Sequence, residues 1–450
     1  MIVAYFFLWY NNLMKIAVIV AEFNPLHKGH EYLIQQTRAL TDCTHIVVIQ
    51  TGNFTQRAEP AIMEKHLRAQ SAIMCGVDAV LEMPTAYATN NAEVFAKAGV
   101  QIANTIPHAS YLVFGVEDNN LAILKQIAYV KITKSREFDK YIKIHLKAGL
   151  SYSDAQAEVI KKLLPEIPPA VVTRILSGGN NILAIEYLRE LYRLRSSIQP
   201  ISIARFKDKN KQTNTSALAI RDAFYHSQTI EQHIPAQVLP FTMQAMEKHP
   251  VKEMFESTIL FGALTDLDIK HTYNATPEIA KLFRGHRPVT YEQLINDMPN
   301  RQYSVSRIKR VALHATLGVT KKDVQFIYQR NHLPYVNLLA IRSDAHDLFN
   351  ELSSIRLTPV ILHGNHNRPT IDKYYIRMRQ IDHRANSLYE ISCKQKFVQK
   401  PLYVILANNP ADPIVEDAPA NDEFMHMADD LDDTTTIKRE TTSNSPDVEN

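Results

Sequence analysis

The sequence predicts an α/β protein with a parallel sheet in its N-terminal half, a mostly helical basic second half and a disordered acidic tail. Between residues 16 and 115, short apolar runs alternate with helical patterns, which favours a parallel sheet covered by helices. From about residue 235 the pattern becomes helical, with many basic residues. Residues 411–450 hold twelve acidic and two basic residues among Ser, Thr and Pro, a composition that cannot bury a core.

Length and composition are those of a soluble cytoplasmic protein. A chain of 450 residues can form two or more domains with substantial cores. Its three cysteines are scattered and odd in number, so we expect neither a disulfide framework nor a Cys-based metal site. No segment has the roughly 18 uncharged apolar residues of a membrane helix. Residues 1–13 are apolar and uncharged without the features of a signal peptide, and we expect a spurious extension before a natural start at Met14.

Charge is unevenly distributed along the chain. The net charge is +3, but residues 411–450 carry −10 and the rest of the chain therefore carries +13. A basic body favours a polyanionic partner such as RNA. A solvated basic surface without a partner is the alternative.

The first strand and the turn after it carry the strongest functional pattern. Residues 16–21 form an apolar run typical of a strand buried on both faces, and Asn24-Pro25 ends it. His27, Gly29 and His30 follow at the start of a helical pattern. A strand, tight loop and helix aim backbone N–H groups and a helix dipole at one point, which suits phosphate. Two incidental histidines are the alternative, since a bare H-x-G-H is a weak motif.

A second buried strand, residues 45–50, leads into a polar loop over residues 51–61. Ligands bind at the carboxyl ends of parallel strands, and Arg57 in this loop can hold an anion. A plain strand-to-helix connection is the alternative. Further strands are expected at residues 79–83 and 111–114, with Gly115 positioned either to admit a nucleotide or simply to turn the chain.

The region from 120 to 230 offers more candidate ligand contacts. Residues 120–176 are mostly helical and rich in lysine. Asn180 precedes a helix, where it can cap the helix or contact a base or ribose. Arg205 lies on a strand expected at residues 198–206. Ser216 opens another helix that includes Arg221, and the pair forms either a second anion site or a simple cap with an exposed arginine.

The predicted RNA-binding residues lie in the segment 300–310. Basic side chains interleaved with an aromatic suit RNA phosphates and stacked bases, although a solvated helix face is the usual explanation of such a run. The four candidates are Arg301, Arg307, Lys309 and Arg310. His363 and His366 imitate a metal pair, but no third ligand is near in the sequence, so we expect a loop and no metal site.

Taken with its strand and turn, the histidine motif resembles the H-x-G-H nucleotidyltransferase superfamily, whose members have a Rossmann-like parallel sheet. Within it, the chain is similar from Met14 to about residue 340 to the bacterial tRNA(Met) cytidine acetate ligases. The matching pieces are Val20 to Leu33, Gly52-Asn53-Phe54, Gln56-Arg57, Glu59-Pro60-Ala61, Phe114-Gly115, Gly149, Ser151-Tyr152, Asn180, Ile182-Leu183, Arg205, Ser216-Ala217, Ile220-Arg221 and the Arg301 to Arg310 segment.

The resemblance implies a reaction and a set of ATP contacts. Acetate and ATP form acetyl-adenylate and pyrophosphate, and the acetyl group passes to the wobble cytidine of elongator tRNA(Met), with release of AMP. Mg2+ is expected to accompany ATP. The implied ATP contacts are Val20, Ala21, Glu22, Phe23, Asn24, Pro25, Leu26, His27, Lys28, Gly29, His30, Glu31, Tyr32, Leu33, Gly115, Asn180 and Arg205.

The sequence also departs from this family. The family commonly has glycine where this chain has Ala58, a threonine where Leu218 stands, and a different segment after Arg205, where Phe206 to Lys209 stands here. Residues 341–450 look unlike the family. The nucleotide pocket is retained, and the changes in the segment after Arg205 put the activity of the chain in question.

We expect a nucleotidyltransferase-like ATP-binding domain over residues 14–230, a helical tRNA-binding domain over 231–405 and a disordered tail over 406–450. The main hypothesis is an ATP-dependent tRNA acetate ligase in which His27 and His30 are catalytic, without a stable protein partner or a membrane. The alternatives are a nucleotidyltransferase that adenylates another small molecule and a non-catalytic RNA-binding paralogue.

Overall fold

The computed structural model describes residues 14–205, 216–265, 269–286, 288–298, 303–361, 372–397, 399–405 and 414–416. The strands are β1 (Ile16–Ala21), β2 (His45–Thr51), β3 (Ala79–Met83), β4 (Ala109–Val116), β5 (Gln199–Ala204), β6 (Val336–Arg342), β7 (Val360–Ile361), β8 (Leu402–Ile405) and β9 (Ile414–Glu416).

The helices are α2 (Lys28–Leu40), α3 (Lys65–Met74), α4 (Thr85–Ala88), α5 (Ala92–Thr105), α6 (Leu121–Thr133), α7 (Ser135–Lys147), α8 (Tyr152–Leu163), α9 (Pro169–Ser177), α10 (Gly179–Leu194), α11 (Ala217–Tyr225), α12 (Leu239–Met246), α13 (Lys252–Thr265), α14 (Pro277–Gly285), α15 (Tyr291–Asp297), α16 (Val305–Leu317), α17 (Lys321–Gln329), α18 (His346–Ser354) and α19 (Lys373–Cys393). Three short 3-10 turns are η1 (Glu231–His233), η2 (Ala236–Val238) and η3 (Ile269–His271).

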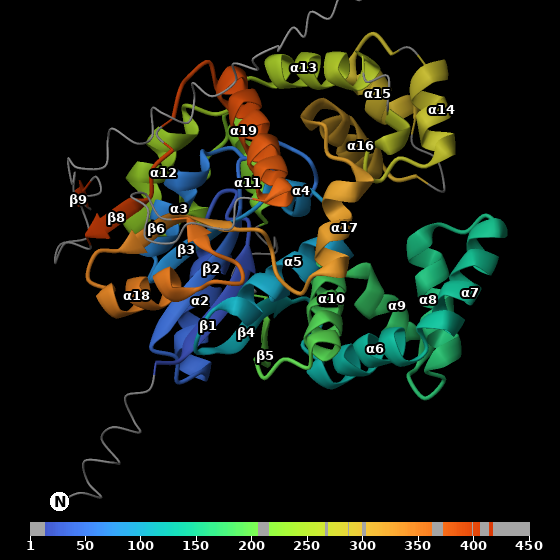
Figure 1. Ribbon diagram of the computed structural model, residues 1–450, viewed down its shortest axis with the longest axis horizontal. Coiled ribbons are helices and arrows are strands. Elements are labelled where there is room, and N and C mark those ends of the chain that lie inside the picture. Colours follow the sequence, from blue (N-terminus) through green and yellow to red (C-terminus); the bar gives the residue numbers. More distant parts are fainter. Residues whose placement is uncertain are drawn as a thin grey trace, which may run out of the picture.

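One sheet runs through the molecule in the order β5-β4-β1-β2-β3-β6-β8-β9, with β7 beside β6 (Figure 1). Strands β5, β4, β1, β2 and β3 are parallel to their neighbours, which confirms the predicted parallel sheet. The chain moves outward from β1 through β2 and β3, then returns to the other side of β1 for β4 and β5. The carboxyl ends of β1 and β4 therefore flank a topological switch point, the place where open α/β sheets bind ligands.

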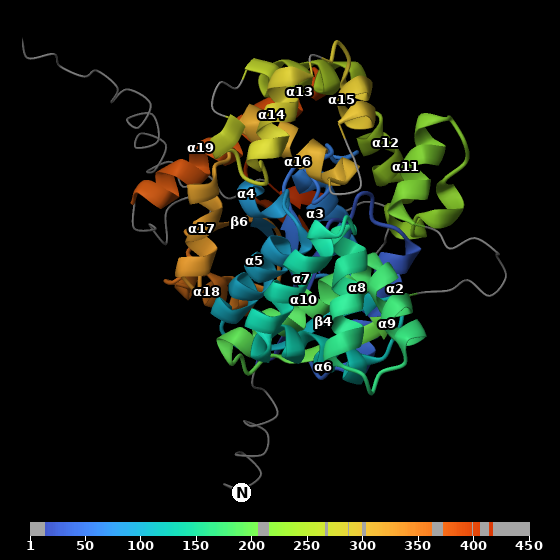
Figure 2. The same ribbon diagram turned by 90° about the vertical axis from the view of Figure 1, so that its right-hand side faces the viewer.

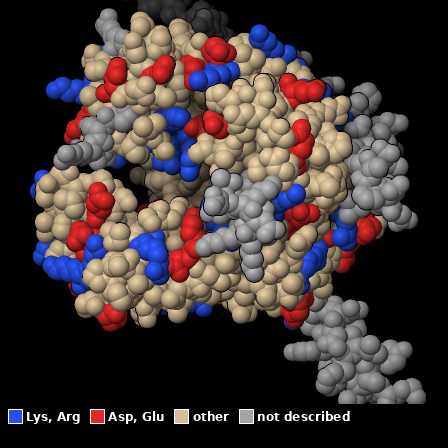
Figure 3. Space-filling view, turned by 180° about the vertical axis from the view of Figure 1, so that it is seen from behind, with Lys and Arg blue, Asp and Glu red and all other residues tan. Residues whose placement is uncertain are grey.

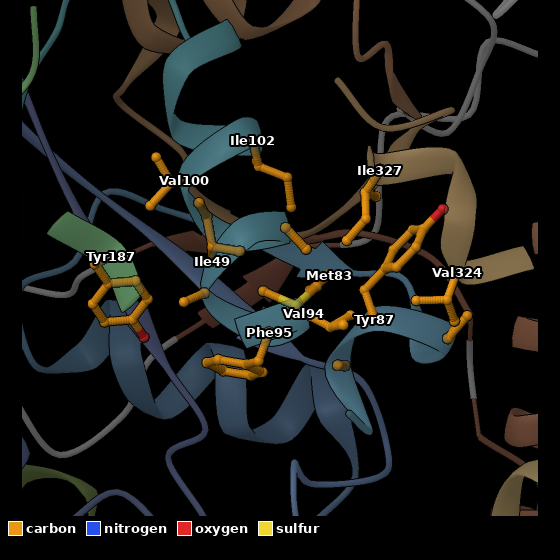
Figure 4. Packing of buried hydrophobic residues seen from close by; sticks show 14 of the residues in the cluster. Ile49, Met83, Tyr87, Val94, Phe95, Val100, Ile102, Tyr187, Val324 and Ile327 are labelled. Atoms are coloured by element: carbon orange, nitrogen blue, oxygen red, sulfur yellow. The ribbon is translucent and has the colours of Figure 1, made fainter. Parts of the chain in front are cut away.

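The central strands are buried on both faces because apolar residues occupy both sides of the pleat. In β1, Ile16 and Val18 join the core beneath α5 and α10, whereas Ala17 and Ile19 join the core beneath α2 and α3. Helix α17 extends the first of these cores, since its Ile327 is buried in the same cluster (Figure 4). A fully buried sheet explains why β1, β2 and β3 read as continuous apolar runs.

Two helical lobes extend from the sheet (Figures 1 and 2). One is built from α6 to α9 against α10, and the other from α13 to α16. They belong to different parts of the sequence and lie on the same side of the molecule in Figure 1, one above the other. Helix α19 packs on α13 and on α4, and so connects the second lobe to the sheet.

The second half of the chain is mostly helical, as predicted, but it also contributes strands that the sequence analysis did not anticipate. β6 pairs antiparallel with β3, and β8 pairs parallel with β6. This pairing covers the edge that β3 would otherwise expose. The expected domain boundary at residues 230 and 231 is therefore not a boundary of the sheet, because strands from both halves of the chain belong to it. Within the expected disordered tail, β9 pairs antiparallel with β8; the remaining tail residues lie outside the described part.

Cys43, Cys75 and Cys393 are all free thiols. None of the helices in the described part of the chain combines the length and apolar character that crossing a membrane requires.

Candidate active site

The loop from β1 to α2 places two imidazole rings at the start of a helix. Phe23 adopts a left-handed backbone angle (φ 48°), and His27 is the N-cap of α2. The rings of His27 and His30 stack with centroids 3.8 Å apart, and Phe23 packs edge-on against His30 at 5.0 Å. The predicted strand, turn and helix are all present, with both rings at the positive end of the α2 dipole.

Both histidine rings use Nδ1 as a hydrogen-bond acceptor. The Gly29 N–H donates to Nδ1 of His27 at 3.0 Å, and the His27 N–H donates to Nδ1 of His30 at 3.3 Å. Burial and then the charge of Arg205 lower the pKa of His27 to about 4; burial and then His27 hold the pKa of His30 well below its usual value. Each ring is therefore neutral at pH 7 with its proton on Nε2. Each ring therefore carries one N–H donor, at Nε2.

Glu117, directly after β4, gathers the other three residues for which the resemblance implied ATP contact. Asn180 donates from Nδ2 to the Glu117 carboxylate at 2.9 Å, and an Arg205 guanidinium nitrogen lies 3.8 Å from it. Gly115 lies within β4, two residues before Glu117 and opposite Ile203 of β5. The carboxylate also accepts the backbone N–H of Asn180 and so lies at the N-terminus of α10.

Arg205 connects this group to the histidines. Its backbone N–H donates to the Val116 carbonyl at 3.0 Å, which places it at the carboxyl end of the sheet. Its charge contributes to the lowered pKa of both His27 and His30. The switch point of the sheet thus brings together residues that are about 180 positions apart in the sequence. Sequence reasoning missed Glu117, although a polar residue at the end of a parallel strand is itself a recognisable indication.

His233, in η1, was also missed. Its charge contributes to the lowered pKa of His27. Nothing in its local sequence distinguishes it from a surface histidine, because only the tertiary fold brings η1 to the histidine loop.

A buried arginine fixes the ends of β1 and β2. Arg68 of α3 is fully buried and donates to the backbone carbonyls of Glu22, Thr51 and Met63. Burial lowers its pKa, while Tyr389 and nearby carboxylates oppose that change. These bonds set the relative position of the two loops that follow β1 and β2. Arg68 is thus a positioning residue, and it is not among the site residues that the sequence predicted.

The loop over residues 51–61 lies directly against the histidine loop. The Gln56 N–H donates to the Glu22 carboxylate at 2.7 Å, whereas the Arg57 side chain is exposed. Ala58 is buried and has a φ of 61°, a conformation that costs a non-glycine residue about 1–2 kcal/mol. A glycine, which the resemblance led us to expect at this position, would adopt this positive φ without that cost.

Helix α11 places Arg221 against the histidine loop. The Arg221 guanidinium donates to the Asn24 carbonyl at 2.7 Å. The Ser216 hydroxyl accepts the Ala219 N–H at 3.2 Å and so caps the helix, while Leu218 is exposed in its first turn. The structure brings Arg221 to the loop; the predicted phosphate contacts of Arg57, Ser216 and Arg221 stay predictions. The residues from Phe206 to Lys209 lie outside the described part.

Three of the four predicted RNA-binding residues are already bonded to other groups of the protein, and two of them contact the loop of residues 51–61. Lys309 bonds the Glu59 carboxylate at 2.6 Å, and Arg310 donates to the Gln56 carbonyl at 3.0 Å. Arg307 donates to the Asn274 carbonyl at 3.2 Å. Helix α16 therefore contacts the loop of residues 51–61. Arg301 lies outside the described residues.

The two helical lobes flank a hollow on the surface (Figure 3). Lys and Arg side chains lie around this hollow, and a group of them lies on its upper wall. Among the described residues, no group of three or more His, Cys, Asp or Glu side chains could hold a metal ion. His363 and His366 lie outside the described part.

Comparison with known proteins places this geometry in a family. A family model described as HIGH Nucleotidyl Transferase matches residues 14–401. The tRNA(Met) cytidine acetate ligase of Caldicellulosiruptor saccharolyticus is 30% identical over 409 residues, which cover 87% of this chain and 99% of that protein. The chain belongs to the tRNA(Met) cytidine acetate ligase family. The family member of Halothermothrix orenii is 28% identical over 425 residues, covering 88% of this chain and 96% of that relative.

A solved structure shares the fold. Thermotoga maritima TmcAL, crystallised with alpha-thio ATP, has a TM-score of 0.78 to this chain at 24% identity, covering 86% of this chain and 97% of that one. This likeness confirms the predicted fold class.

Proposed function

We propose that this chain is an ATP-dependent ligase that acetylates the wobble cytidine of elongator tRNA(Met). The observation that carries the proposal is the pair of neutral imidazoles, His27 and His30, at the N-terminus of α2 and the switch point of the sheet. Membership in the tRNA(Met) cytidine acetate ligase family supports the choice of substrates.

In the first step, an acetate oxygen attacks the α-phosphorus of ATP, and pyrophosphate leaves with the electron pair of the broken P–O bond. Negative charge builds on the phosphate oxygens during this step. The Nε2–H groups of His27 and His30 are aimed from a fixed, buried position, because their Nδ1 atoms are held by backbone N–H groups. Donors that are oriented before the reaction stabilise such charge without reorganisation.

In the second step, the exocyclic amine of the cytidine attacks the acetyl carbonyl, AMP leaves, and the amine loses a proton. The mixed anhydride is needed because an aryl amine is a weak nucleophile. Lys309 and Arg310 contact the loop of residues 51–61, and Arg307 lies on the same helix, α16. We assign all three to the RNA near the reacting base.

For ATP, we assign the stretch from Val20 to Leu33 to the phosphates and Gly115, Asn180 and Arg205 to the nucleoside end. The Glu117 carboxylate can accept a hydrogen bond from a ribose hydroxyl, a role that acids at strand ends have in other dinucleotide-binding folds. Mg2+ would be held mainly by phosphate oxygens and water, which fits described residues that offer no three-ligand cluster. We further propose a cytoplasmic enzyme without a stable protein partner.

Mass spectrometry of tRNA nucleosides tests the function. Purified protein, unmodified tRNA(Met), ATP and acetate should give acetylcytidine, and omission of either ATP or acetate should abolish it. Acetate-dependent ATP–pyrophosphate exchange without acetylcytidine would instead favour adenylation for another acceptor. Absence of both would favour a non-catalytic RNA-binding protein.

A further inference from the structure

Helix α7 presents a row of four basic side chains on one face. Arg136, Lys140, Lys143 and Lys147 are spaced by four, three and four residues and are all exposed. At 3.6 residues per turn they fall within an arc of about 60° and extend over about 16 Å along the helix. We name these four residues the α7 stripe.

The opposite face of α7 anchors the helix to its lobe. Phe138 and Ile142 are buried there, and α7 packs on α8. Nearby, the Lys162 ammonium lies over the ring of Tyr141 at 3.7 Å. Because the buried face fixes the rotation of the helix, the four cations are held outward together.

The stripe has no acidic partner within the described part of the chain. None of its four residues takes part in an ion pair among the described residues, and the acidic Glu137 and Asp139 lie to either side of its arc. By contrast, Lys131 and Lys161 in the same lobe bond Glu186 and Glu158. Like charges at these spacings destabilise a helix by a few tenths of a kcal/mol per pair. An anionic ligand would offset that repulsion.

The other predicted RNA-binding segment is differently placed. Arg307, Lys309 and Arg310 are each engaged with backbone or carboxylate oxygens of the protein. Binding of RNA there competes with these contacts, whereas the α7 stripe binds without breaking any ion pair of the described residues. The α7 stripe can therefore bind a long polyanion at a lower cost in existing contacts than Arg307, Lys309 and Arg310 can.

In Figure 1 the lobe that carries α7 lies below the lobe that carries α14, and the space-filling view shows a hollow on this side of the molecule (Figure 3). Seen from behind, Lys and Arg side chains appear along the outer edge of this lobe as well as around the hollow (Figure 3).

We propose that the α7 stripe binds the sugar–phosphate backbone of the tRNA, away from the reacting base. This inference rests on the proposed function, because it takes the tRNA as the polyanion. The stripe contributes affinity and salt dependence without sequence recognition, since lysine contacts to phosphates carry no base information.

The test replaces Arg136, Lys140, Lys143 and Lys147 by Gln and measures tRNA(Met) binding against salt concentration. Each lost phosphate contact reduces the slope of log K against log salt by roughly 0.7–0.9, so we expect a slope shallower by about 3. Affinity at low salt should fall at least tenfold. Acetate-dependent ATP–pyrophosphate exchange should equal that of the parent, which also shows that the variant is folded.

A matched control replaces four exposed cations on the side of α18 and α19 by Gln. It has the same change in net charge and should leave the slope within about 0.5 of the parent value, less than one phosphate contact. The control residues are Arg356, Lys373, Lys394 and Lys400.

A parent-like slope in the stripe variant, or an equal loss in the control, would overturn the inference. So would tighter tRNA binding by the stripe variant. Failure of the proposed function gives a different result, because the parent protein would then form no acetylcytidine. If the parent acetylates tRNA and the stripe variant binds tRNA as the parent does, only the proposed role of the α7 stripe is refuted.

Discussion

The imidazole rings of His27 and His30 stack 3.8 Å apart, and the backbone N–H of the first donates to Nδ1 of the second. This relationship fixes the tautomer of both rings, since a ring nitrogen that accepts a hydrogen bond carries no proton. The remaining proton of each ring is then on Nε2, the atom that we propose donates to the phosphates. The capping of α2 and the presentation of donors are therefore one arrangement.

The buried histidines make the fold sensitive to acid. The pKa of His27 is lowered to about 4, so between pH 6.5 and pH 4 the unfolded chain binds a proton that the folded chain excludes. Stability is complete above pH 6.5 and is lost as the pH falls. His27→Asn keeps an N-cap acceptor but removes the titration. Urea unfolding from pH 6.5 to 4 should show the parent losing about 3 kcal/mol more than this variant. Parallel stability curves would contradict the lowered pKa.

Glu117 should act through the residues that it positions. Glu117→Ala removes the acceptor for Asn180 and the neighbour of Arg205, and we expect the KM for ATP to rise about tenfold with kcat changed less than threefold, a loss of about 1.4 kcal/mol in ATP binding. Asp118→Ala is the control, because that carboxylate bonds Arg174 instead. Equal KM values for the parent and both variants would show that Glu117 is merely a helix cap.

Ala58→Gly should be tolerated, because it relieves a left-handed backbone angle of 61°. The relief of about 1–2 kcal/mol exceeds the loss of a buried methyl group, about 0.8 kcal/mol. We expect the free energy of unfolding to stay constant or rise by up to about 1 kcal/mol. Ala61, equally buried in the same loop without a positive φ, is the control, and Ala61→Gly should destabilise. Thermal or urea unfolding that ranks the two variants in the opposite order would refute this account.

Arg310 should couple RNA binding to adenylation. It donates to the Gln56 carbonyl, and the Gln56 N–H holds Glu22 beside the histidine loop. Arg310→Ala should therefore weaken tRNA binding and also slow ATP–pyrophosphate exchange several-fold, about 1 kcal/mol in the barrier. Arg307→Ala, which loses contacts with the Asn274 carbonyl and the Tyr303 ring, should weaken tRNA binding alone. Identical exchange rates in the two variants would argue against the coupling.

The local patterns of the sequence predict the first five strands and the histidine turn well. β1, β2 and β3 coincide closely with the apolar runs, because each is short, mostly buried and bounded by turn residues, while β4 and β5 are less buried but lie where strands were expected. The second half was harder. β6 joins the sheet by pairing with β3 across more than 250 residues, and no local pattern records that partner.

The same distinction holds for the site. His27 and His30 are close in sequence, so their spacing predicts their proximity. Arg68 and Glu117 act through backbone groups and helix ends that only the folded chain assembles. The engagement of Arg310 with Gln56 was likewise invisible, and it moves the predicted RNA-binding helix from a separate surface to the edge of the active site.

The most direct test of the central claim is acetate-dependent ATP–pyrophosphate exchange by His27→Asn and His30→Ala proteins. We expect each to lose on the order of 10²–10³ in exchange rate, with ATP affinity changed far less, because the donors act on charge that develops as pyrophosphate leaves. Supplied with synthetic acetyl-adenylate, the same variants should still acetylate tRNA(Met). Exchange at the parent rate in either variant would contradict the proposed role of the two histidines.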